Sequence, residues 1–345
     1  MSMNEGNSDH RDNVENDEKE QEIIEKDFVP HFLPTYRVKM NLFPLPIIAV
    51  ITIAGILAYL TYFVAGYQIE GGYISEKEYG PLGGILNGII FTVLAVISAF
   101  IIVFIIRKKG IDVLKYIFGF TFGFLGFMLT WFFSVIIIAI IMSVYFYAIP
   151  NFLNILDMIA NIISPLVVGV FIFFLLYRYF KSKSIFTKNA IVLYNSLLIG
   201  ASMGIFLPLW TTIAILIGIS FWDMYAVLHK RGPIKEMIDI ASNSYNNDLV
   251  DESLELRVKS GEAIYDTSRV EIGIGDLAFY SLLTSSSLIQ TDNLFVMIFT
   301  SIAILIGTGI TLMGLKRNKI LPGLPISIFL GIGTMFLSWY LFSIL

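Results

Sequence analysis

The fold and the candidate chemistry both depend on one stretch, EIGIGDLAFYSLL, which runs from Glu271 to Leu283. It places the acid Asp276 about one and a half helical turns into a segment that otherwise starts a membrane-spanning helix. A charge at that depth costs roughly 2.5 to 3.5 kcal/mol on insertion scales, and such residues usually line a pathway, pair with another group or do chemistry. The stretch therefore raises the question of what this acid does.

The composition is that of an integral, multi-pass membrane protein. Hydrophobic residues make up 56% of the 345 residues, charged residues only 14%, and the mean hydropathy is +0.78, far outside the range of soluble domains. We expect it in the cell membrane. Cysteine is absent and there are three histidines, which excludes disulfides, thiolate metal sites and a zinc protease motif. We expect no metal and no cofactor.

The apolar runs predict an all-α membrane protein with nine transmembrane helices, each long enough to cross a hydrocarbon core of roughly 30 Å. The expected spans are residues 43–66, 84–106, 116–147, 157–179, 189–208, 210–228, 272–289, 294–315 and 321–345. The third is too long for one straight span, so it must tilt, kink or project beyond the bilayer.

The basic residues predict the orientation and the domains. With a cytoplasmic N-terminus and nine spans, all of the 23 Lys and Arg residues except Lys77 lie on the inner side, which is the positive-inside pattern, and the C-terminus is external. We expect an acidic, disordered cytoplasmic tail over residues 1–40. Residues 41–208 then form spans one to five, and residues 209–345 form spans six to nine with a cytoplasmic loop over 229–270.

Asp276 has a counterpart at the same depth. Asp223 precedes the inner end of its span by six residues, and Asp276 follows the inner end of the next span by five, so both lie roughly 7 to 9 Å from the cytoplasmic boundary. Two facing carboxyls hold one proton between them, so that one activates water while the other donates to a substrate carbonyl. The alternative roles, helix-end residues or ion-pair partners, are weakened because neither span carries a nearby Lys or Arg.

Two further elements lie at this depth. Gly273 and Gly275 precede Asp276 and leave room for another backbone, although glycines in membrane helices often only help them pack. Pro322 and Pro325 flank Gly323 and Leu324 at the inner start of the last span. Prolines there leave backbone groups free for an extended, unwound substrate, although a proline can also simply start a helix.

With these elements in order, the chain resembles the presenilin-type intramembrane aspartyl proteases, the GxGD family, and in particular a microbial homologue. The resemblance rests on FWDMYAVLHKRGPIKEMIDIA (221–241), GIGDLAFYSLL (273–283) and PGLPISI (322–328). Two residues depart from the family pattern: Trp222 stands where the family has Tyr, and Gly323 where its proline motif has Ala. Both changes leave the two acids in place.

The resemblance implies a presenilin-like fold and an endopeptidase that cuts transmembrane helices near their cytoplasmic end. It implies Asp223 and Asp276 as catalytic acids. The implied substrate-binding residues are Trp222, Gly273, Ile274, Gly275, Pro322, Gly323, Leu324 and Pro325. The expected partners are transmembrane-helix substrates and the lipid bilayer, with no nucleic acid and no required accessory subunit, and with a homo-oligomer left open.

Three other readings compete with this one. A proton-coupled transporter would also keep paired intramembrane acids, but it would more often show an internal repeat. A signal-peptide-peptidase-like protease has the same acid motifs but the opposite orientation in the membrane. A purely structural membrane protein would not need the acids, the glycines and the proline loop at one depth. The stretch GASMG (200–204) matches a serine-nucleophile pattern, but no histidine lies inside a span to act as its base.

Overall fold

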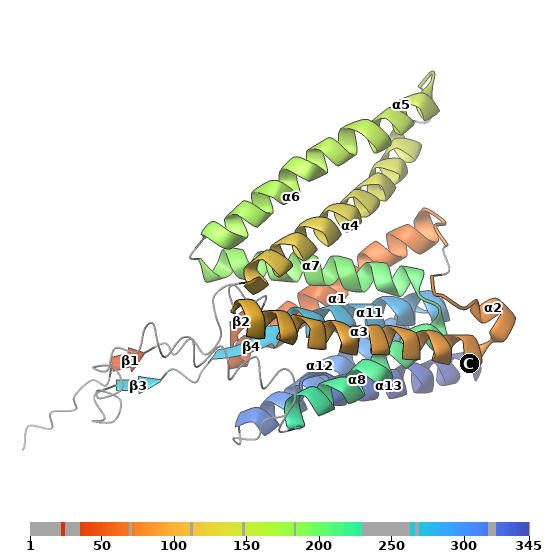
Figure 1. The fold of residues 1–345 in the computed structure, drawn as a ribbon. Helices are drawn as coiled ribbons and strands as arrows, with labels where there is room; N and C mark the ends of the chain where they lie inside the picture. Colours follow the sequence, from red (N-terminus) through yellow and green to blue (C-terminus); the bar gives the residue numbers. More distant parts are fainter. Residues whose placement is uncertain are drawn as a thin grey trace, which may run out of the picture.

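The computed structural model describes residues 22–24, 35–68, 71–110, 113–146, 149–182, 184–229, 263–265, 269–316 and 322–344, and these are mostly helical (Figure 1). The helices are α1 (Pro44–Tyr59, continued by the π-helical turn Leu60–Val64), α2 (Glu76–Tyr79), α3 (Pro81–Lys109), α4 (Val113–Tyr145), α5 (Phe152–Met158, continued by the π-helical turn Ile159–Ile163), α6 (Ser164–Lys181), α7 (Ile185–Phe206), α8 (Leu209–Leu228), α11 (Ile274–Thr291), α12 (Leu294–Lys316) and α13 (Leu324–Ile344). The strands are β1 (Glu22–Ile24), β2 (Thr35–Lys39), β3 (Ala263–Tyr265) and β4 (Arg269–Gly273).

The helices confirm the predicted all-α membrane class. Among the described residues, eight helical segments are long and apolar enough to cross a membrane, and they correspond to eight of the nine predicted spans. The remaining predicted span, 272–289, corresponds to α11, which carries a polar run from Thr284 to Ser287. The number of crossings and the orientation of the ends stay predictions.

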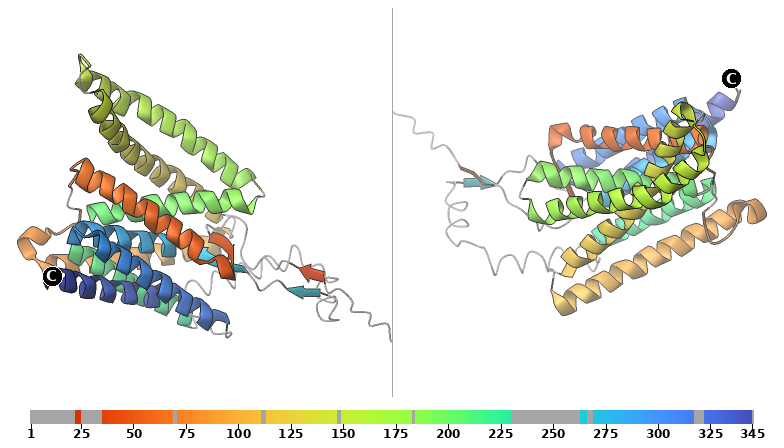
Figure 2. Two further views of the ribbon diagram at one scale, coloured as in Figure 1. Left: turned by 180° about the vertical axis from the view of Figure 1, so that it is seen from behind. Right: turned by 90° about the horizontal axis from the view of Figure 1, so that it is seen from above.

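Helix α11 is polar because it lies inside the protein. It packs against α7, α1, α12, α13 and α8, and Figures 1 and 2 show it surrounded by these helices. Ser281 and the run from Thr284 to Ser287 are at most 1% exposed. Neighbouring helices rather than lipid therefore surround these hydroxyls, so that a sequence too polar for a lipid-facing span is stable there.

The contact between α7 and α11 is close because α7 carries glycines where α11 carries serines. A Cβ on Gly200 would overlap Ser281 and the carbonyl of Ala278, and one on Gly204 would overlap Ser285. Small residues let two helix backbones approach in this way. The GASMG stretch is thus a packing surface, consistent with its rejection as a nucleophile motif.

Helices α4 and α6 form a pair that leans away from the rest of the bundle (Figure 1). The long third span corresponds to one continuous helix of 33 residues, α4. Only 17% of the apolar window of either helix is buried, against 67% for α7. The fold therefore has a packed centre around α11 and a thinly packed arm formed by α4 and α6.

Two parts of the tail that was expected to be disordered form strands, β1 and β2. Most of the expected tail over residues 1–40, and most of the expected loop over 229–270, lie outside the described residues. Within them, however, β2 pairs antiparallel with β4, and β1 pairs in parallel with β3. Tyr36 and Val38 alternate along β2 and pack on the main core, which gives this polar segment an apolar face.

Candidate active site

Asp223 lies near the C-terminal end of α8 and contacts the start of α13. Its Oδ2 atom accepts a hydrogen bond from the backbone N–H of Leu324, at 3.2 Å. Leu324 is the first residue of α13, so this N–H has no partner within its own helix. A carboxylate is also favourable beside the positive end of a helix. The acid thus joins the end of one helix to the beginning of another.

Asp276, the third residue of α11, reaches the same loop from the other side. A Cβ on Gly323 would lie only 2.9 Å from Asp276 Oδ2, so the bare backbone of Gly323 lies directly against this carboxyl. Gly323 and Leu324 are consecutive residues, so the two acids contact adjacent positions of one loop. The structure therefore brings Asp223 and Asp276 together with Gly323 and Leu324 between helices α8, α11 and α13.

The two prolines have different positions in this loop. Pro322 is buried just before α13, and Pro325 is the second residue of that helix. The first turn of a helix tolerates proline because its N–H would lack a partner there anyway. Pro325 thus takes the helix-starting role that the sequence had left open, and the backbone N–H of Leu324 is used by Asp223.

A buried hydroxyl network holds the loop in place. The Tyr280 hydroxyl lies 3.3 Å from both the Gly323 carbonyl and Ser327 Oγ, and Ser327 Oγ lies 3.0 Å from Thr308 Oγ1. Tyr280 is four residues after Asp276, so both side chains lie on the same face of α11. The network connects α11, α12 and α13 immediately beside the acids.

Gly273 and Gly275 have open surroundings. A Cβ on Gly275 would meet only Phe279 of its own helix, at 3.9 Å, and one on Gly273 would meet only Asp276, at 3.7 Å. Neither glycine is needed for the helices to pack as they do here, in contrast to the packing role that the sequence had allowed. Ile274, between them, packs on a second apolar cluster formed by Phe122, Tyr179, Ile191 and Val192.

Trp222 contacts helix α3. Its ring contacts Phe100 edge-on, with centroids 5.9 Å apart, and it also lies beside Tyr225. In this arrangement the large aromatic residue before Asp223 fixes α8 against α3.

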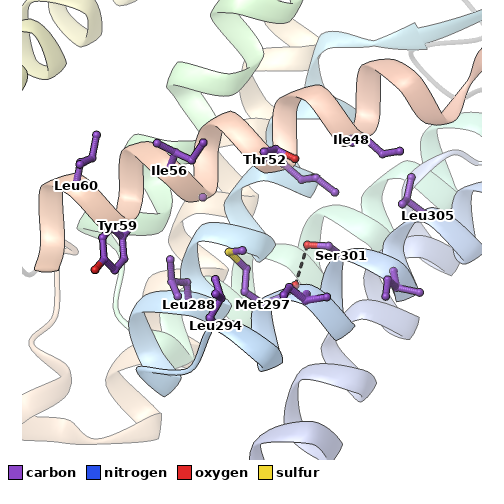
Figure 3. A pocket seen from close by; sticks show the side chains of 14 residues that line it. Ile48, Thr52, Ile56, Tyr59, Leu60, Leu288, Leu294, Met297, Ser301 and Leu305 are labelled. Carbon is purple, nitrogen blue, oxygen red and sulfur yellow. Dashed lines mark hydrogen bonds between the residues drawn. The ribbon is translucent and has the colours of Figure 1, made fainter.

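A separate cavity lies away from the acids. It has a volume of about 630 Å³ and is formed by α1, α11 and α12, with an almost wholly apolar lining (Figure 3). Its lining includes neither acid and no residue of the proline loop. In the part of the chain that the structure describes, no group of three or more His, Cys, Asp or Glu side chains is placed to hold a metal ion.

Sequence reasoning missed the residues that support the acids. Tyr280, Thr308 and Ser327 are ordinary polar residues in apolar helices, and only the spacing of four between Asp276 and Tyr280 was visible beforehand. Strand β2 was hidden in the expected tail, since five residues have no local pattern that reveals a partner more than 200 residues away.

Comparison with known proteins identifies the family. The Presenilin family model matches residues 47–253 and 246–345. Over 134 residues the chain is 38% identical to Presenilin-B of Dictyostelium discoideum, an alignment that spans 38% of this chain and 26% of that relative. It is 22% identical over 331 residues to a presenilin-like protein of Arabidopsis thaliana, covering 76% of this chain and 79% of the relative.

A solved structure of a presenilin family intramembrane aspartate protease has the same fold. It superposes with a TM-score of 0.54 at 13% sequence identity, covering 88% of this chain and 100% of that one. The predicted resemblance is thus confirmed by a family model that spans nearly the whole membrane region and by the shared fold. The chain belongs to the presenilin family.

Proposed function

We propose that the protein is an intramembrane aspartic endopeptidase with Asp223 and Asp276 as its catalytic acids. The observation that supports this most strongly is the position of Gly323 and Leu324, which lie against one carboxyl each. One loop segment thus contacts two acids that come from different helices. Membership of the presenilin family also supports this proposal, since the chain shares its fold with an aspartate protease of that family.

The proposed chemistry needs only the two acids and water. The pair holds one proton, and its ionised carboxylate takes a second proton from a water whose oxygen attacks the peptide carbonyl carbon. The protonated carboxyl gives its proton to the carbonyl oxygen, which forms a tetrahedral gem-diol. Collapse of this intermediate breaks the C–N bond as the nitrogen takes a proton, leaving one carboxyl end, one amine end and one proton on the pair.

The substrate in this proposal is a membrane-spanning helix that unwinds near its cytoplasmic end. A peptide bond within a helix is shielded by its own hydrogen bonds, so cleavage requires an extended segment. We assign Gly273, Ile274 and Gly275, with Trp222 and the loop from Pro322 to Pro325, as the residues that receive it. The open sides of the two glycines support this assignment, because a substrate backbone could approach them without displacing another helix.

The test is cleavage of a single-span reporter by purified protein in liposomes. We expect the wild type to cut it without accessory subunits, and Asp223→Asn and Asp276→Asn each to lower the rate by at least about 10²-fold. Both variants should remain folded, because Asn keeps the shape of the side chain and removes a charge that is costly at this depth. The rate of the wild type should show a bell-shaped pH dependence that belongs to the pair.

Asp292→Asn is the matched control. Asp292 is exposed at the other end of α11 and has a φ of 50°, a backbone conformation that Asn also tolerates, so this variant should cut at the wild-type rate. If Asp223→Asn or Asp276→Asn retained the wild-type rate, the assignment of the two catalytic acids would be overturned. Absence of cleavage by folded wild type, together with proton flux that needs both acids, would favour a transporter instead.

A further inference from the structure

Strand β2 lies beside the segment that leads into Asp276. Its residues Thr35–Lys39 pair antiparallel with β4, Arg269–Gly273, and the register places Thr35 opposite Gly273 and Arg37 opposite Glu271. Strand β4 ends at Gly273 and α11 begins at Ile274, so no linker separates the strand pair from the helix. The N-terminal segment therefore contacts the chain up to three residues before the candidate catalytic acid.

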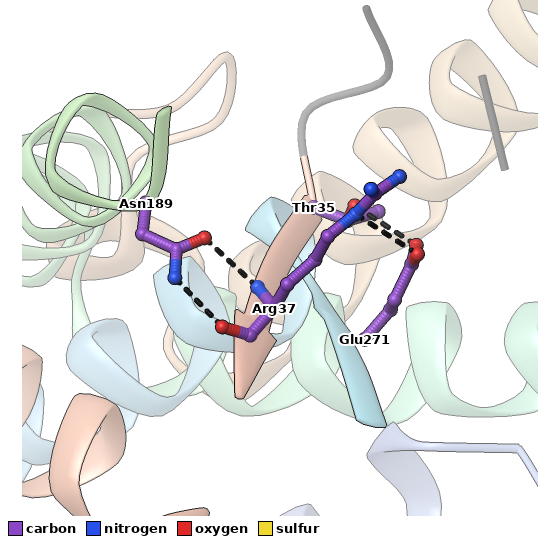
Figure 4. A network of polar contacts seen from close by, with 4 residues as sticks. All are labelled: Thr35, Arg37, Asn189 and Glu271. Carbon is purple, nitrogen blue, oxygen red and sulfur yellow. Dashed lines mark hydrogen bonds and ion pairs between the residues drawn. The ribbon is translucent and has the colours of Figure 1, made fainter. Parts of the chain in front are cut away.

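Side chains on β2 engage both oxygens of Glu271. Arg37 Nε lies 3.1 Å from Glu271 Oε1, and the Thr35 hydroxyl donates to Glu271 Oε2 at 2.9 Å, as Figure 4 shows. The Arg37 and Glu271 side chains are 12% and 26% exposed. A partly desolvated pair with a second hydrogen bond is less screened than a free surface pair, so it resists sliding of one strand along the other.

Asn189 on α7 binds the outer edge of β2. Its Oδ1 accepts the Arg37 N–H at 2.9 Å, and its Nδ2 donates to the Arg37 carbonyl at 2.7 Å (Figure 4). These backbone groups therefore point away from β4, so Arg37 and Glu271 form a non-hydrogen-bonded pair, the kind whose side chains lie closest. Strand β2 is thereby fixed between α7 and β4.

The first turn of α11 is held by two apolar side chains, because Ile274 packs on the second cluster and Leu277 is buried in the main core. Gly273 caps the helix without a side-chain hydrogen bond, and neither Gly273 nor Gly275 adds a side chain there. The pairing of β4 fixes the point from which this turn starts. A shift of β4 would move Asp276 relative to Asp223, which is held separately by Leu324.

From this geometry we infer that Arg37, Glu271 and Asn189 are positioning residues for the proposed protease, acting through β2 and β4 to place Asp276. The inference rests on the proposed function and adds to it an N-terminal element that completes the site. Strand β2 stays paired during cleavage; it is not an occupant that must leave before a substrate can enter.

The first test reverses the charges of the Arg37–Glu271 ion pair in the full-length protein. Arg37→Glu and Glu271→Arg should each lower kcat by about tenfold with KM little changed, because misplacement of a reacting group acts on the chemical step. The double variant should recover most of the lost rate, which a merely unfolded protein would not do. Lys39→Glu reverses a charge on the same strand at an exposed position and should leave kcat unchanged.

The second test uses the absence of cysteine in the chain. Arg37→Cys with Glu271→Cys places two thiols at a directly opposed pair, a separation suited to a disulfide. The reduced protein should be slow and the oxidised protein should regain most of the wild-type kcat. If oxidation abolished activity, β2 would have to leave during turnover, and the positioning role would be overturned.

The two proposals fail in different ways. A wild type that cuts nothing would overturn the proposed function itself. A wild type that depends on Asp276, combined with charge-reversed variants of unchanged kcat, would overturn only the role of β2.

Discussion

Gly200 and Gly204 on α7 differ sharply in surroundings from Gly273 and Gly275 at the start of α11. The first pair meets the serine face of α11 so closely that a single added methyl group would overlap it, whereas a methyl group on either glycine of the second pair would make only ordinary contacts, at 3.7 Å or more. Within each pair the two glycines are only a few residues apart in apolar sequence, so composition alone does not distinguish the roles of the two pairs. The comparison shows that a glycine in a membrane helix can either allow close contact between two helices or leave space beside the backbone. Which of the two applies depends on the position of the neighbouring helix.

The largest effect is expected from Gly200→Ala. The new Cβ would collide with Ser281 and a backbone carbonyl that cannot rotate away, so overpacking should cost about 1–3 kcal/mol of folding stability. This loss should exceed the gain of up to about 1 kcal/mol from better helix propensity. Thermal unfolding in detergent measures it.

Gly333→Ala is the control for that substitution, since a Cβ on Gly333 of α13 meets nothing within 4 Å. It should leave stability unchanged or slightly raised. Equal melting temperatures for the two variants would remove the distinction between packed and open glycines.

The same substitution at Gly275 should separate stability from activity. We expect Gly275→Ala to keep or slightly raise the melting temperature, because no helix is displaced. Cleavage of a transmembrane reporter should fall about tenfold in kcat/KM, or about 1.4 kcal/mol of transition-state stabilisation, because the methyl group enters the space assigned to substrate. A destabilised Gly275→Ala protein would instead show that this glycine is a packing residue.

The smallest effect is expected from Gly323→Ala. The added Cβ would approach Asp276 Oδ2 to 2.9 Å, but a carboxyl is the end of a flexible side chain and can move by a few tenths of an ångström. The alanine of the family's proline motif occupies this position, so we expect a rate within about threefold of wild type, or about 0.7 kcal/mol. A larger loss would mean that the loop in this chain depends on glycine.

Much of the fold was readable because hydropathy is a local property. Eight predicted spans correspond to helices of sufficient length, and the two acids could be assigned a common depth by counting residues from helix ends. The roles of Asp223 and Asp276 stay predictions until they are tested, although the structure places them beside the loop that the sequence had singled out.

What could not be predicted depends on contacts between distant segments. The burial of the polar run in α11 could not be predicted, because it follows only from the five surrounding helices. Strand β2 exists because β4 is available to pair with it, and the serine-nucleophile pattern around Ser202 is explained by the helix that packs on it. Each of these features requires knowledge of a neighbour that no local pattern supplies.

The central position of α11 has a consequence for the order in which the protein is assembled. The chain is synthesised from its N-terminus, so the glycine face of α7 is complete long before residue 274 emerges. The six apolar helices that precede α11 are therefore made before it, and three of them, α1, α7 and α8, lack their common neighbour until α11 arrives. Acquisition of a packed core is thus delayed to the last fifth of synthesis, and the candidate site cannot form at any earlier stage.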